Sequence, residues 1–582
     1  MAGGNPTGGS SGAAKPHRLP RTLIFTATFN ERGNIELLLE RVFALDPSFE
    51  MLVVDDNSPD GTGQILEQIA ATNPRLHVIQ RPRKMGIGSA HLLAMTFSVR
   101  QGFDRLVTMD ADFSHDPADI PRLLDALEHA DFVIGSRYTE GGNSDYKGYR
   151  RVISVCGNMA AHFLLRIPLR EFTTSFRAFT VETLKNRRCG KLRSSGYSFF
   201  METVFRMSRA GVRMAEVPIQ FKDRLFGISK IPRFEVINGI SRLLWLSASS
   251  VVGMDKFSPA SDVEGTCGYC HSPYLIENFA SSPAEAAERA NAGAYRCSSA
   301  QHRKKPRVAQ CLQCGLIQIP STSRPSNLVD LYREVEDPLY LEHRKAREIN
   351  FEMTFRRIES FLPPPGRLLE IGAYCGLFLA AAKKRGWQSV GVEPSRWAAS
   401  IAREQGGIEV HEGTLAENMA KLGGDFDAVV AWDVLEHVDS PYELLIDANR
   451  MLRPGGIFCF STIDIDTWLP RLLGRQWPWI MDMHLYYFTA ALLRRWLNDA
   501  GFDVVHDSNY RHYATLLYLW EKGMAIFPAP VTKLLRSLSR LFPIGVVIPI
   551  SFGDVKLFVA RKRQSAERAE FDPKIVPLKA AF

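Results

Sequence analysis

The chain has 582 residues, and at about 100–200 residues per domain this length excludes a single compact core. Hydrophobic residues make up 45% and charged residues 23%, which are the proportions of folded globular proteins and exclude a disordered or fibrous chain. The formal net charge of +8 is spread over the whole length and is too dilute for a dedicated nucleic-acid binder.

The first twenty residues are rich in glycine and serine, lack the apolar run of a signal peptide and predict a flexible tail. The most apolar stretches, 234–254 and 540–551, are interrupted by polar residues and prolines, so we expect no transmembrane helix. Nine cysteines are sparse, and four of them form two C-x-x-C pairs. This favours metal binding or free thiols in a reducing, cytoplasmic compartment over a secreted disulfide framework.

From Thr22 to about Phe132, short apolar strands alternate with helical patterns. The alternation predicts a parallel sheet covered by helices, with functional residues at the carboxyl ends of the strands. Asp55-Asp56 and the D-x-D pair Asp110 and Asp112 both follow such strands. Two carboxylates one residue apart can bind Mg2+ or Mn2+ together with substrate phosphates. A D-x-D pair alone also fits two solvated acids in a turn.

Residues 22–250 resemble the dolichyl-phosphate mannose synthases of the family-2 glycosyltransferases. The motifs that carry the resemblance are TATFNERGNI at 26–35, VVDDNSPDGT at 53–62, MDADFSHDP at 109–117, IGSRY at 134–138, YKGYRRVIS at 146–154, TTSFRAF at 173–179 and EVPIQFKDRLFGISK at 216–230. The resemblance implies a GT-A nucleotide-sugar fold. It also implies metal-dependent transfer of a hexose, mannose from GDP-mannose, to a polyprenyl or dolichyl phosphate.

The same resemblance assigns residues to the site. Those implied to bind the donor are Ala27, Phe29, Glu31, Val54, Asp56, Asp110, Ala111, Asp112, Ser114, Arg137, Met201, Arg224 and Lys230. Among them Asp110, Asp112 and Ser114 would hold the metal. Asp112 and Arg137 would be catalytic. Two residues depart from the family pattern, since Ala27 replaces a proline and Thr174 replaces a glycine, and both changes can shift donor preference.

The expected acceptor explains why no catalytic base is required. A phosphate monoester has a second pKa of about 6 and is mostly dianionic at pH 7. The site instead needs positive charge around two phosphates and the acceptor, and a metal ion on the leaving diphosphate. Arg137, Arg177, Arg224 and Lys230 would supply that charge, the alternative being a solvated basic surface.

A helix is predicted within 234–254. At helical spacing its apolar side holds Ile237, Ile240, Leu243, Leu244 and Trp245, with Arg233 and Arg242 available to lipid head groups. The pattern fits a helix that rests on the bilayer and equally an ordinary core helix. The first interpretation places the protein peripherally at the inner face of the membrane.

The segment after 262 carries the cysteine pairs Cys267-x-x-Cys270 and Cys311-x-x-Cys314. Their spacing is that of a tetrahedral zinc site, which is structural when four thiolates leave no open position. The intervening segment also contains His271, Cys297 and His302, any of which can substitute for a ligand.

From Arg367 a second strand-helix series begins with EIGAYCG, which resembles the glycine-rich first motif of class I S-adenosylmethionine-dependent methyltransferases. Tyr374 occupies a position of this motif that is often held by glycine. Glu393 ends the next strand, where an acid can accept both ribose hydroxyls. DFDAVVAWDVLEHV at 425–438, MLRPGGIFCFST at 451–462 and HLYYFT at 484–489 follow. Together these motifs resemble methyltransferases that tailor sugars and polysaccharides and carry an N-terminal cysteine-pair domain. The implied cofactor residues are Glu370, Gly372, Gly376, Glu393 and Asp433.

Methyl transfer to an alcohol benefits from a base, and two histidines are candidates. His437 follows the fourth strand of the cofactor sheet and is our candidate catalytic residue, although a Glu-His pair here also serves structure in this fold. His484 lies among aromatic residues that can form a sugar-facing wall or pack in the core.

We therefore predict an α/β protein with two Rossmann-like domains, a GT-A fold and then a class I methyltransferase fold, separated by a small zinc-binding segment. The predicted segments are a tail at 1–20, the glycosyltransferase at 21–252, a linker at 253–262, the zinc-binding segment at 263–330, the methyltransferase at 331–510, a helical and strand extension at 511–562 and a tail at 563–582. The predicted function is bifunctional: a mannosyl transferase and a methyltransferase acting on a sugar or glycan of the same pathway, without nucleic-acid partners. The alternatives are a different donor or acceptor with a nucleic-acid methyltransferase, or one half that is a degenerate glycan-binding module.

Overall fold

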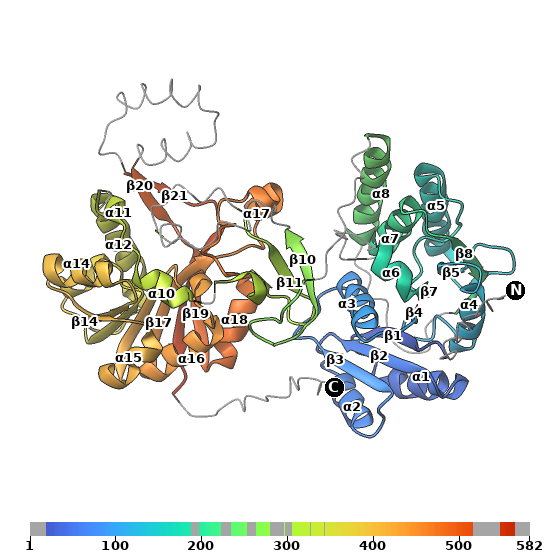
Figure 1. Ribbon diagram of the computed structural model, residues 1–582, viewed down its shortest axis with the longest axis horizontal. Coiled ribbons are helices and arrows are strands. Elements are labelled where there is room, and N and C mark those ends of the chain that lie inside the picture. The colour runs from blue at the N-terminus through green and yellow to red at the C-terminus, as the bar shows by residue number, and fades with distance from the viewer. Residues whose placement is uncertain are drawn as a thin grey trace, which may run out of the picture. The chain divides into compact units, whose positions relative to one another are not determined.

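The computed structural model of the chain describes residues 19–187, 196, 198–222, 234–252, 263–279, 296, 305–325, 327–342, 344–515 and 547–564. The chain divides into two compact units, Met1–Ala260 and Ser261–Phe582 (Figure 1). The predicted linker at 253–262 lies outside the described residues, as do Arg224, Lys230, Arg233, Cys297 and His302.

Unit 1 is a seven-stranded sheet in the order β3-β2-β1-β4-β7-β5-β8, covered by helices. Its elements are β1 (Thr22–Thr28), α1 (Arg32–Leu45), β2 (Glu50–Asp55), α2 (Thr62–Ala70), β3 (Leu76–Gln80), α3 (Ile87–Arg100), β4 (Arg105–Thr108), η1 (Pro117–Asp119), α4 (Ile120–Ala126), β5 (Phe132–Ser136), β6 (Asn143–Ser144), α5 (Gly148–Leu165), β7 (Arg177–Thr180), α6 (Val181–Arg187), α7 (Ser198–Arg209), β8 (Met214–Pro218), β9 (Gln220–Phe221) and α8 (Phe234–Val252). Strands β3, β2, β1 and β4 are parallel, and β7 runs antiparallel between β4 and β5. The sheet is GT-A-like, as predicted.

The sequence of the central strands explains their position. Strands β1 and β2 each contain a run of apolar residues, Leu23–Phe25 and Met51–Val54, and are buried along almost their whole length. A parallel strand that is covered by helices on both faces requires this composition. Because β1, β2 and β4 are parallel, their carboxyl ends meet at one edge, which brings Asp55-Asp56 and the D-x-D turn together.

Helix α8 divides its apolar side chains between two environments. Leu243 is buried, whereas Ile240, Leu244 and Trp245 are 57%, 58% and 41% exposed. Arg242 is not available to lipid head groups as we had expected, because it forms an ion pair of 2.7 Å with a buried carboxylate, Glu202. The helix is therefore partly a core helix and partly an exposed apolar surface.

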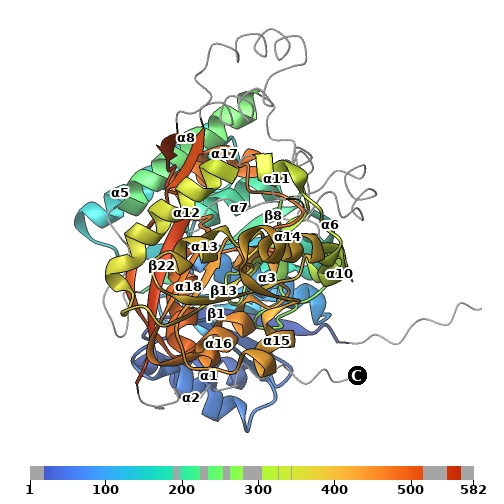
Figure 2. The same ribbon diagram turned by 90° about the vertical axis from the view of Figure 1, so that its left-hand side faces the viewer.

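Unit 2 is built on a seven-stranded sheet in the order β15-β14-β13-β16-β17-β22-β19. Its elements are β10 (Leu275–Phe279), β11 (Val308–Cys311), β12 (Ile317–Gln318), η3 (Ser321–Ser323), α10 (Leu328–Arg333), α11 (Pro338–Glu342), α12 (Arg344–Ile358), η4 (Glu359–Phe361), β13 (Arg367–Ile371), α13 (Leu377–Lys383), β14 (Gln388–Glu393), α14 (Arg396–Gly406), β15 (Glu409–Glu412), α15 (Leu415–Leu422), β16 (Phe426–Trp432), η5 (Leu435–His437), α16 (Pro441–Met451), β17 (Leu452–Ile463), α17 (Trp468–Leu473), η6 (Gly474–Gln476), β18 (Tyr486–Tyr487), α18 (Ala490–Asp499), β19 (Phe502–Asn509), β20 (His512–Thr515), β21 (Val547–Ile550) and β22 (Val555–Lys562). Strand β22 lies between β17 and β19 and runs antiparallel to both, whereas the other neighbouring strands of this sheet are parallel. Helices α12, α13 and α14 cover one face of the sheet, and α15, α16 and α18 cover the other (Figures 1 and 2). This is the predicted class I methyltransferase architecture.

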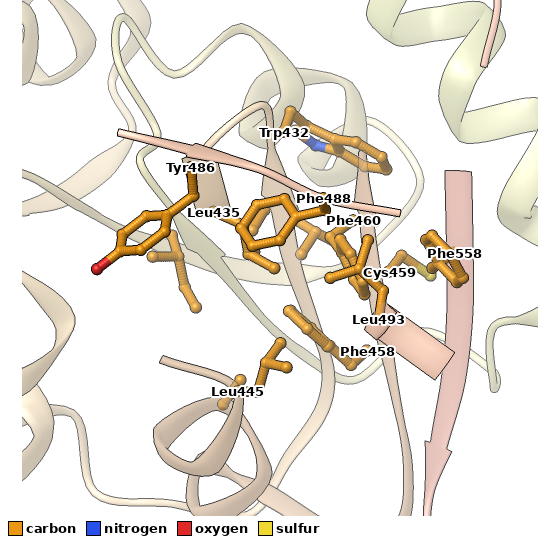
Figure 3. Packing of buried hydrophobic residues seen from close by; sticks show 14 of the residues in the cluster. Trp432, Leu435, Leu445, Phe458, Cys459, Phe460, Tyr486, Phe488, Leu493 and Phe558 are labelled. Carbon is orange, nitrogen blue, oxygen red and sulfur yellow. The ribbon is translucent and has the colours of Figure 1, made fainter. Parts of the chain in front are cut away.

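The cysteine segment shares a core with the methyltransferase. Its strands form a sheet in the order β10-β11-β12-β18, and the edge strand β18 comes from the methyltransferase sequence. One continuous apolar cluster joins Cys267 and Cys314 to the strands of the large sheet. Figure 3 shows Phe488, which directly follows β18, packed with Phe460 of β17 and Leu493 of α18. The two segments are therefore expected to unfold together.

A core substitution tests this organisation. Phe460 is fully buried and its ring stacks on Phe558 with a centroid distance of 5.1 Å, so Phe460→Ala should destabilise unit 2 by about 3–5 kcal/mol. Urea unfolding, followed by hydrogen exchange of each unit, should show an earlier transition for unit 2, including β10–β12, and an unchanged unit 1. Leu472→Ala, at a residue that is 73% exposed, is the control. Separate transitions for the cysteine sheet and the large sheet would contradict a shared core.

Candidate active sites

Asp55 and Asp56 have different environments at the carboxyl end of β2. Asp55 accepts hydrogen bonds from the hydroxyl of Thr28 (2.8 Å) and from the backbone N–H of Ser58 (2.9 Å), so it fixes the loop. Asp56 forms an ion pair of 2.5 Å with Arg81 and accepts from the N–H of Met85. Burial raises the pKa of Asp56 despite the opposing effect of Arg81.

Arg81 is a functional-site residue that the sequence did not indicate. Its side chain is fully buried, and it also donates to the hydroxyl of Ser89 (2.6 Å) and to the carbonyl of Gly86 (3.3 Å). The guanidinium thus links Asp56 to the start of α3. Nothing in the local sequence connects an arginine with an acid twenty-five positions earlier, and only the pairing of β2 with β3 brings them together.

The D-x-D pair lies in one tight turn after β4. Asp110 accepts a hydrogen bond of 2.6 Å from the hydroxyl of Ser175, and Asp112 accepts one of 3.1 Å from the N–H of Ser114. Asp112 is only 6% exposed and Ser114 is 2% exposed, which does not fit the alternative of two solvated turn acids. Their hard oxygen atoms suit Mg2+ or Mn2+.

A buried histidine holds this turn in place. The Nδ1 atom of His115 accepts from the backbone N–H of Asp110 (3.2 Å), and burial lowers the pKa of His115, so the ring is neutral with its proton on Nε2. Nε2 therefore donates to the hydroxyl of Thr174, 3.0 Å away. Thr174, one of the two departures from the family pattern, thus acts on the D-x-D turn through His115.

The two predicted arginines within the described residues are placed differently. Arg137 is buried and donates through Nε and Nη2 to Glu171, at 2.8 Å each, which raises the pKa of the guanidinium. Arg177 is 1% exposed and donates to the backbone carbonyls of Phe172, Thr174 and Phe200. We had expected Arg177 to contact phosphate, and the structure corrects this: it supports the loop that carries Thr174.

The remaining donor-site candidates lie around the same edge. Phe29 and Glu31 belong to the loop after β1, where Lys84 lies 4.9 Å from the Phe29 ring centroid and Glu31 accepts from Asn34. The candidates with mostly buried side chains are Val54 in β2, Ala111 in the D-x-D turn and Met201 in α7. Ala27 is paired with Val54 in the sheet.

In unit 2 the glycine-rich loop between β13 and α13 has three residues with positive φ: Gly372 (70°), Tyr374 (46°) and Gly376 (70°). A side chain at Gly372 would approach Val434 to 2.7 Å, so glycine is required there. Tyr374 tolerates its conformation because its N–H donates to Glu393 (2.8 Å) and its ring packs on Tyr340, 4.4 Å between centroids. A tyrosine thus replaces the usual glycine without disrupting the loop.

Two buried acids face each other beneath this loop. Glu393 accepts from the N–H groups of Tyr374 and Ser395, and burial raises its pKa to about 7. Burial and the neighbouring Glu393 raise the pKa of Glu370 well above its usual value, and its Oε2 atom has no hydrogen-bond partner among the described residues. A cationic ligand relieves such a pair, and S-adenosylmethionine carries a sulfonium and an ammonium group.

The predicted residues after β16 form one wall. Asp433 has a φ of 53° and accepts from the hydroxyl of Ser461 (2.7 Å). The rings of His437 and His484 lie 4.8 Å apart, and each has its Nδ1 close to a backbone carbonyl, at 3.0 and 2.9 Å. Since a carbonyl only accepts, Nδ1 carries the proton in both rings. Burial lowers the pKa of His437 to about 4, so it is neutral at pH 7.

Two groups of side chains in the described part of the chain can hold a metal ion. Glu436, His437 and His484 form one group and the four cysteines the other, each with ligand atoms within 4.8 Å of one another. The cysteine sulfur atoms of Cys267 and Cys314 are 3.5 Å apart, and those of Cys270 and Cys311 are 3.6 Å apart. A tetrahedral zinc site with Zn–S bonds of about 2.3 Å requires about 3.8 Å, so the four cysteines fit zinc without a substitute ligand.

Comparison with known proteins identifies both halves. The family described as glycosyl transferase family 2 matches residues 23–188, and the family described as methyltransferase domain matches 340–507. The polyprenol monophosphomannose synthase of Mycolicibacterium smegmatis is 41% identical over 214 residues, which is 36% of this chain and 81% of that protein. The first half belongs to the family-2 polyprenol-phosphate mannose synthases. The undecaprenyl-phosphate mannosyltransferase of Micrococcus luteus is 40% identical over 212 residues, which is 36% of this chain and 87% of that protein.

Solved structures similar to this chain include two methyltransferases. One is a S-adenosylmethionine-dependent methyltransferase and possible histamine N-methyltransferase from Thermotoga maritima. It is 24% identical in sequence, and the match covers 38% of this chain and 91% of that protein, with a TM-score of 0.26. The other is a S-adenosylmethionine-dependent methyltransferase from Archaeoglobus fulgidus. It is 19% identical in sequence, and the match covers 39% of this chain and 100% of that protein, with a TM-score of 0.28. The two family matches and the mannose synthase relatives show that the chain is a fusion of a mannose synthase domain and a methyltransferase domain.

The raised pKa of Glu393 predicts a pH-dependent cofactor site in the methyltransferase half. Above about pH 7 the ionised carboxylate can accept from both ribose hydroxyls, so affinity for S-adenosylmethionine should rise from pH 6 to pH 8. Glu393→Gln should weaken binding about tenfold at pH 8 and remove most of the pH dependence. Calorimetric titration at the two pH values measures this, with Glu404→Gln on the surface as the control. Equal affinity of wild type and Glu393→Gln at pH 8 would refute the role.

The cysteine site predicts zinc that stabilises only the methyltransferase half. Cys311→Ser should lose the zinc and loosen the whole β10-β11-β12-β18 sheet, because thiolate binding contributes folding free energy to the unit that contains the ligands. Metal analysis and hydrogen exchange measure both effects. The mannose synthase half should be unchanged, and so should the exposed-cysteine control Cys156→Ser. Wild-type protein that contains no zinc after gentle purification would argue against the site.

Proposed function

We propose that the first half transfers mannose from GDP-mannose to a polyprenyl phosphate. The observation that supports it most is the D-x-D turn, in which Asp112 and Ser114 are buried and Asp110 is fixed by His115, in a domain of the mannose synthase family. The acceptor phosphate is already a dianion, so the site needs positioned charge and no base.

The residues present suit a divalent metal and a diphosphate. Asp110, Asp112 and Ser114 supply the oxygen ligands that Mg2+ or Mn2+ prefers, and such an ion neutralises charge on the leaving diphosphate. Arg137 uses Nε and Nη2 on Glu171, which leaves Nη1 for a phosphate oxygen. Glu171 and the rings of Tyr138, Tyr146 and Phe221, which lie 5.1–5.9 Å from the guanidinium, keep it oriented.

The acceptor is a membrane lipid, and unit 1 offers an apolar surface for it. Helices α5 and α8 pack on each other, with the Ser247 hydroxyl donating to the Leu164 carbonyl. The exposed apolar side chains on the two helices are Tyr149, Val152, Ile153, Met159, Phe163, Leu164, Ile240, Leu244 and Trp245. We propose that this surface rests on the membrane. No helix within the described residues is long and apolar enough to cross a bilayer.

The second half, we propose, methylates a sugar or glycan of the same pathway with S-adenosylmethionine. Glu370 and Glu393 line the site for the cofactor, where Glu393 can accept from the ribose hydroxyls, and His437 and His484 form a wall at the same sheet edge. The Trp479 ring lies 6.1 Å from the His484 ring, stacks on it and extends this aromatic wall. We retain His437 as the candidate catalytic residue, with a neutral ring that can face the acceptor hydroxyl.

Loss of the D-x-D acid separates the two activities. Asp112→Ala should abolish the transfer of label from GDP-mannose to membrane lipid phosphate in the presence of Mg2+ or Mn2+, because the diphosphate leaves without its counter-charge. Affinity for S-adenosylmethionine, measured by calorimetry, should stay within twofold of wild type. Asp125→Ala, at an exposed position of α4, is the matched control. If the wild-type chain gives no lipid-linked label with any of several nucleotide sugars, the proposed first activity is wrong.

A further inference from the structure

Unit 2 contains a cavity of about 660 Å3 that neither cofactor binding nor zinc explains. It lies at the end of the large sheet where β17 finishes and β22 begins, since Ile463 is paired with Val555 and Asn509 with Lys556. The carboxyl end of β17 belongs to the same edge that carries Asp433 and Glu393. Acceptors of α/β enzymes bind beyond this edge.

Aromatic contacts connect the cavity to the histidine wall. Arg511 lines the cavity. Its two neighbours in the sequence, Tyr510 and His512, have ring centroids 4.8 Å apart. The Tyr510 ring lies 6.3 Å from that of Trp432, the last residue of β16, and the His512 ring lies 6.5 Å from that of Trp479, which stacks on His484. The cavity and the histidine wall therefore adjoin one continuous group of packed aromatic side chains at the same edge of the sheet.

The charged side chains of the described residues that line the cavity are all basic: Arg357, Arg511 and Lys556. Their hydrogen-bond partners there are neutral, because Arg357 donates to the Ser508 hydroxyl (2.8 Å) and Lys556 to the Asn509 amide oxygen (2.7 Å). Burial and the neighbouring Arg511 lower the pKa of Arg357. The buried Asp464 lies near Lys556 and offsets part of its charge, which leaves Arg357 and Arg511 close to each other. A bound anion would relieve this repulsion.

The rim of the cavity is apolar and exposed. Trp468 and Phe552 line it and are 60% and 56% exposed, and Leu472, one turn along α17 from Trp468, is 73% exposed. Exposed apolar side chains beside a basic pocket are complementary to an amphipathic anion. The cavity volume falls within the range of about 300–1,000 Å3 that small-molecule sites have.

We infer that this cavity binds the phosphate of a polyprenyl-phosphate sugar, which is therefore the methyl acceptor. Arginine forks bind phosphate in a bidentate manner, and Trp468, Leu472 and Phe552 would contact the first prenyl units. This assignment rests on the proposed function of the second half and names its substrate class. It also orders the two reactions: mannose is first linked to the lipid phosphate, and the product is then methylated.

Hydrogen exchange of the full chain tests the inference without any catalytic step. Three ligands are compared: farnesyl phosphate mannose, mannose 1-phosphate and octyl mannoside. Farnesyl phosphate mannose should protect 464–473 and 551–556 in the wild type. In Arg357→Gln/Arg511→Gln and in Lys556→Gln, half-maximal protection should require at least tenfold more ligand. Arg471→Gln is the matched control, because Arg471 lies on α17, is paired with Asp466 and does not line the cavity.

The outcomes separate the inference from the proposed function. Three results would overturn the inferred phosphate site. They are equal protection by octyl mannoside, no protection by any of the three ligands, and protection that is unchanged in all cavity variants. Equal protection by mannose 1-phosphate would overturn the lipid part and identify a free sugar phosphate as the ligand. Retained S-adenosylmethionine binding shows that each variant is folded. Whether methyl transfer occurs at all is measured separately, so protection without methylation would refute the proposed function and leave the binding site intact.

Discussion

Burying a carboxylate is costly unless a cation or several N–H groups compensate its charge, and this constraint organises both catalytic edges. In unit 1 the compensation is built in: Arg81 pairs with Asp56, and Arg137 with Glu171. In unit 2 it is incomplete, because Glu370 has an oxygen without a partner among the described residues and Glu393 has only two backbone donors. The first edge is thus ready for a metal and an anionic donor, and the second for a cationic cofactor.

The same constraint explains the residues that depart from family patterns. Thr174 in place of glycine supplies the hydroxyl that accepts from His115, and His115 fixes the backbone of Asp110. Tyr374 in place of glycine adopts a positive φ, and its N–H is one of the two donors to Glu393. Thr174 and Tyr374 therefore each add a polar contact to a buried group.

The sequence predicted both sheets because parallel strands that are covered on both faces need a run of apolar residues, and β1, β2, β13 and β16 each contain one. It also predicted which loops carry the acids, since those loops follow the strands. It did not predict Arg81 or Glu171, whose partners are distant in sequence, or the true role of Arg177, because charge alone does not distinguish a phosphate ligand from a buried donor to carbonyls. The sequence also did not predict the pairing of β12 with β18, because strands of two residues are too short to show an alternation of apolar and polar residues.

In the proposed reaction sequence both halves act in turn on one lipid phosphate. The most direct test is a single incubation of the wild-type chain with GDP-mannose, farnesyl phosphate, a divalent cation and S-adenosylmethionine that carries a deuterated methyl group. Tandem mass spectrometry of the lipid product should find the mannose and the deuterated methyl on the same molecule, with the methyl on the hexose. Abundant mannosyl lipid that carries no deuterium, while the deuterated methyl appears on another compound, would contradict the account.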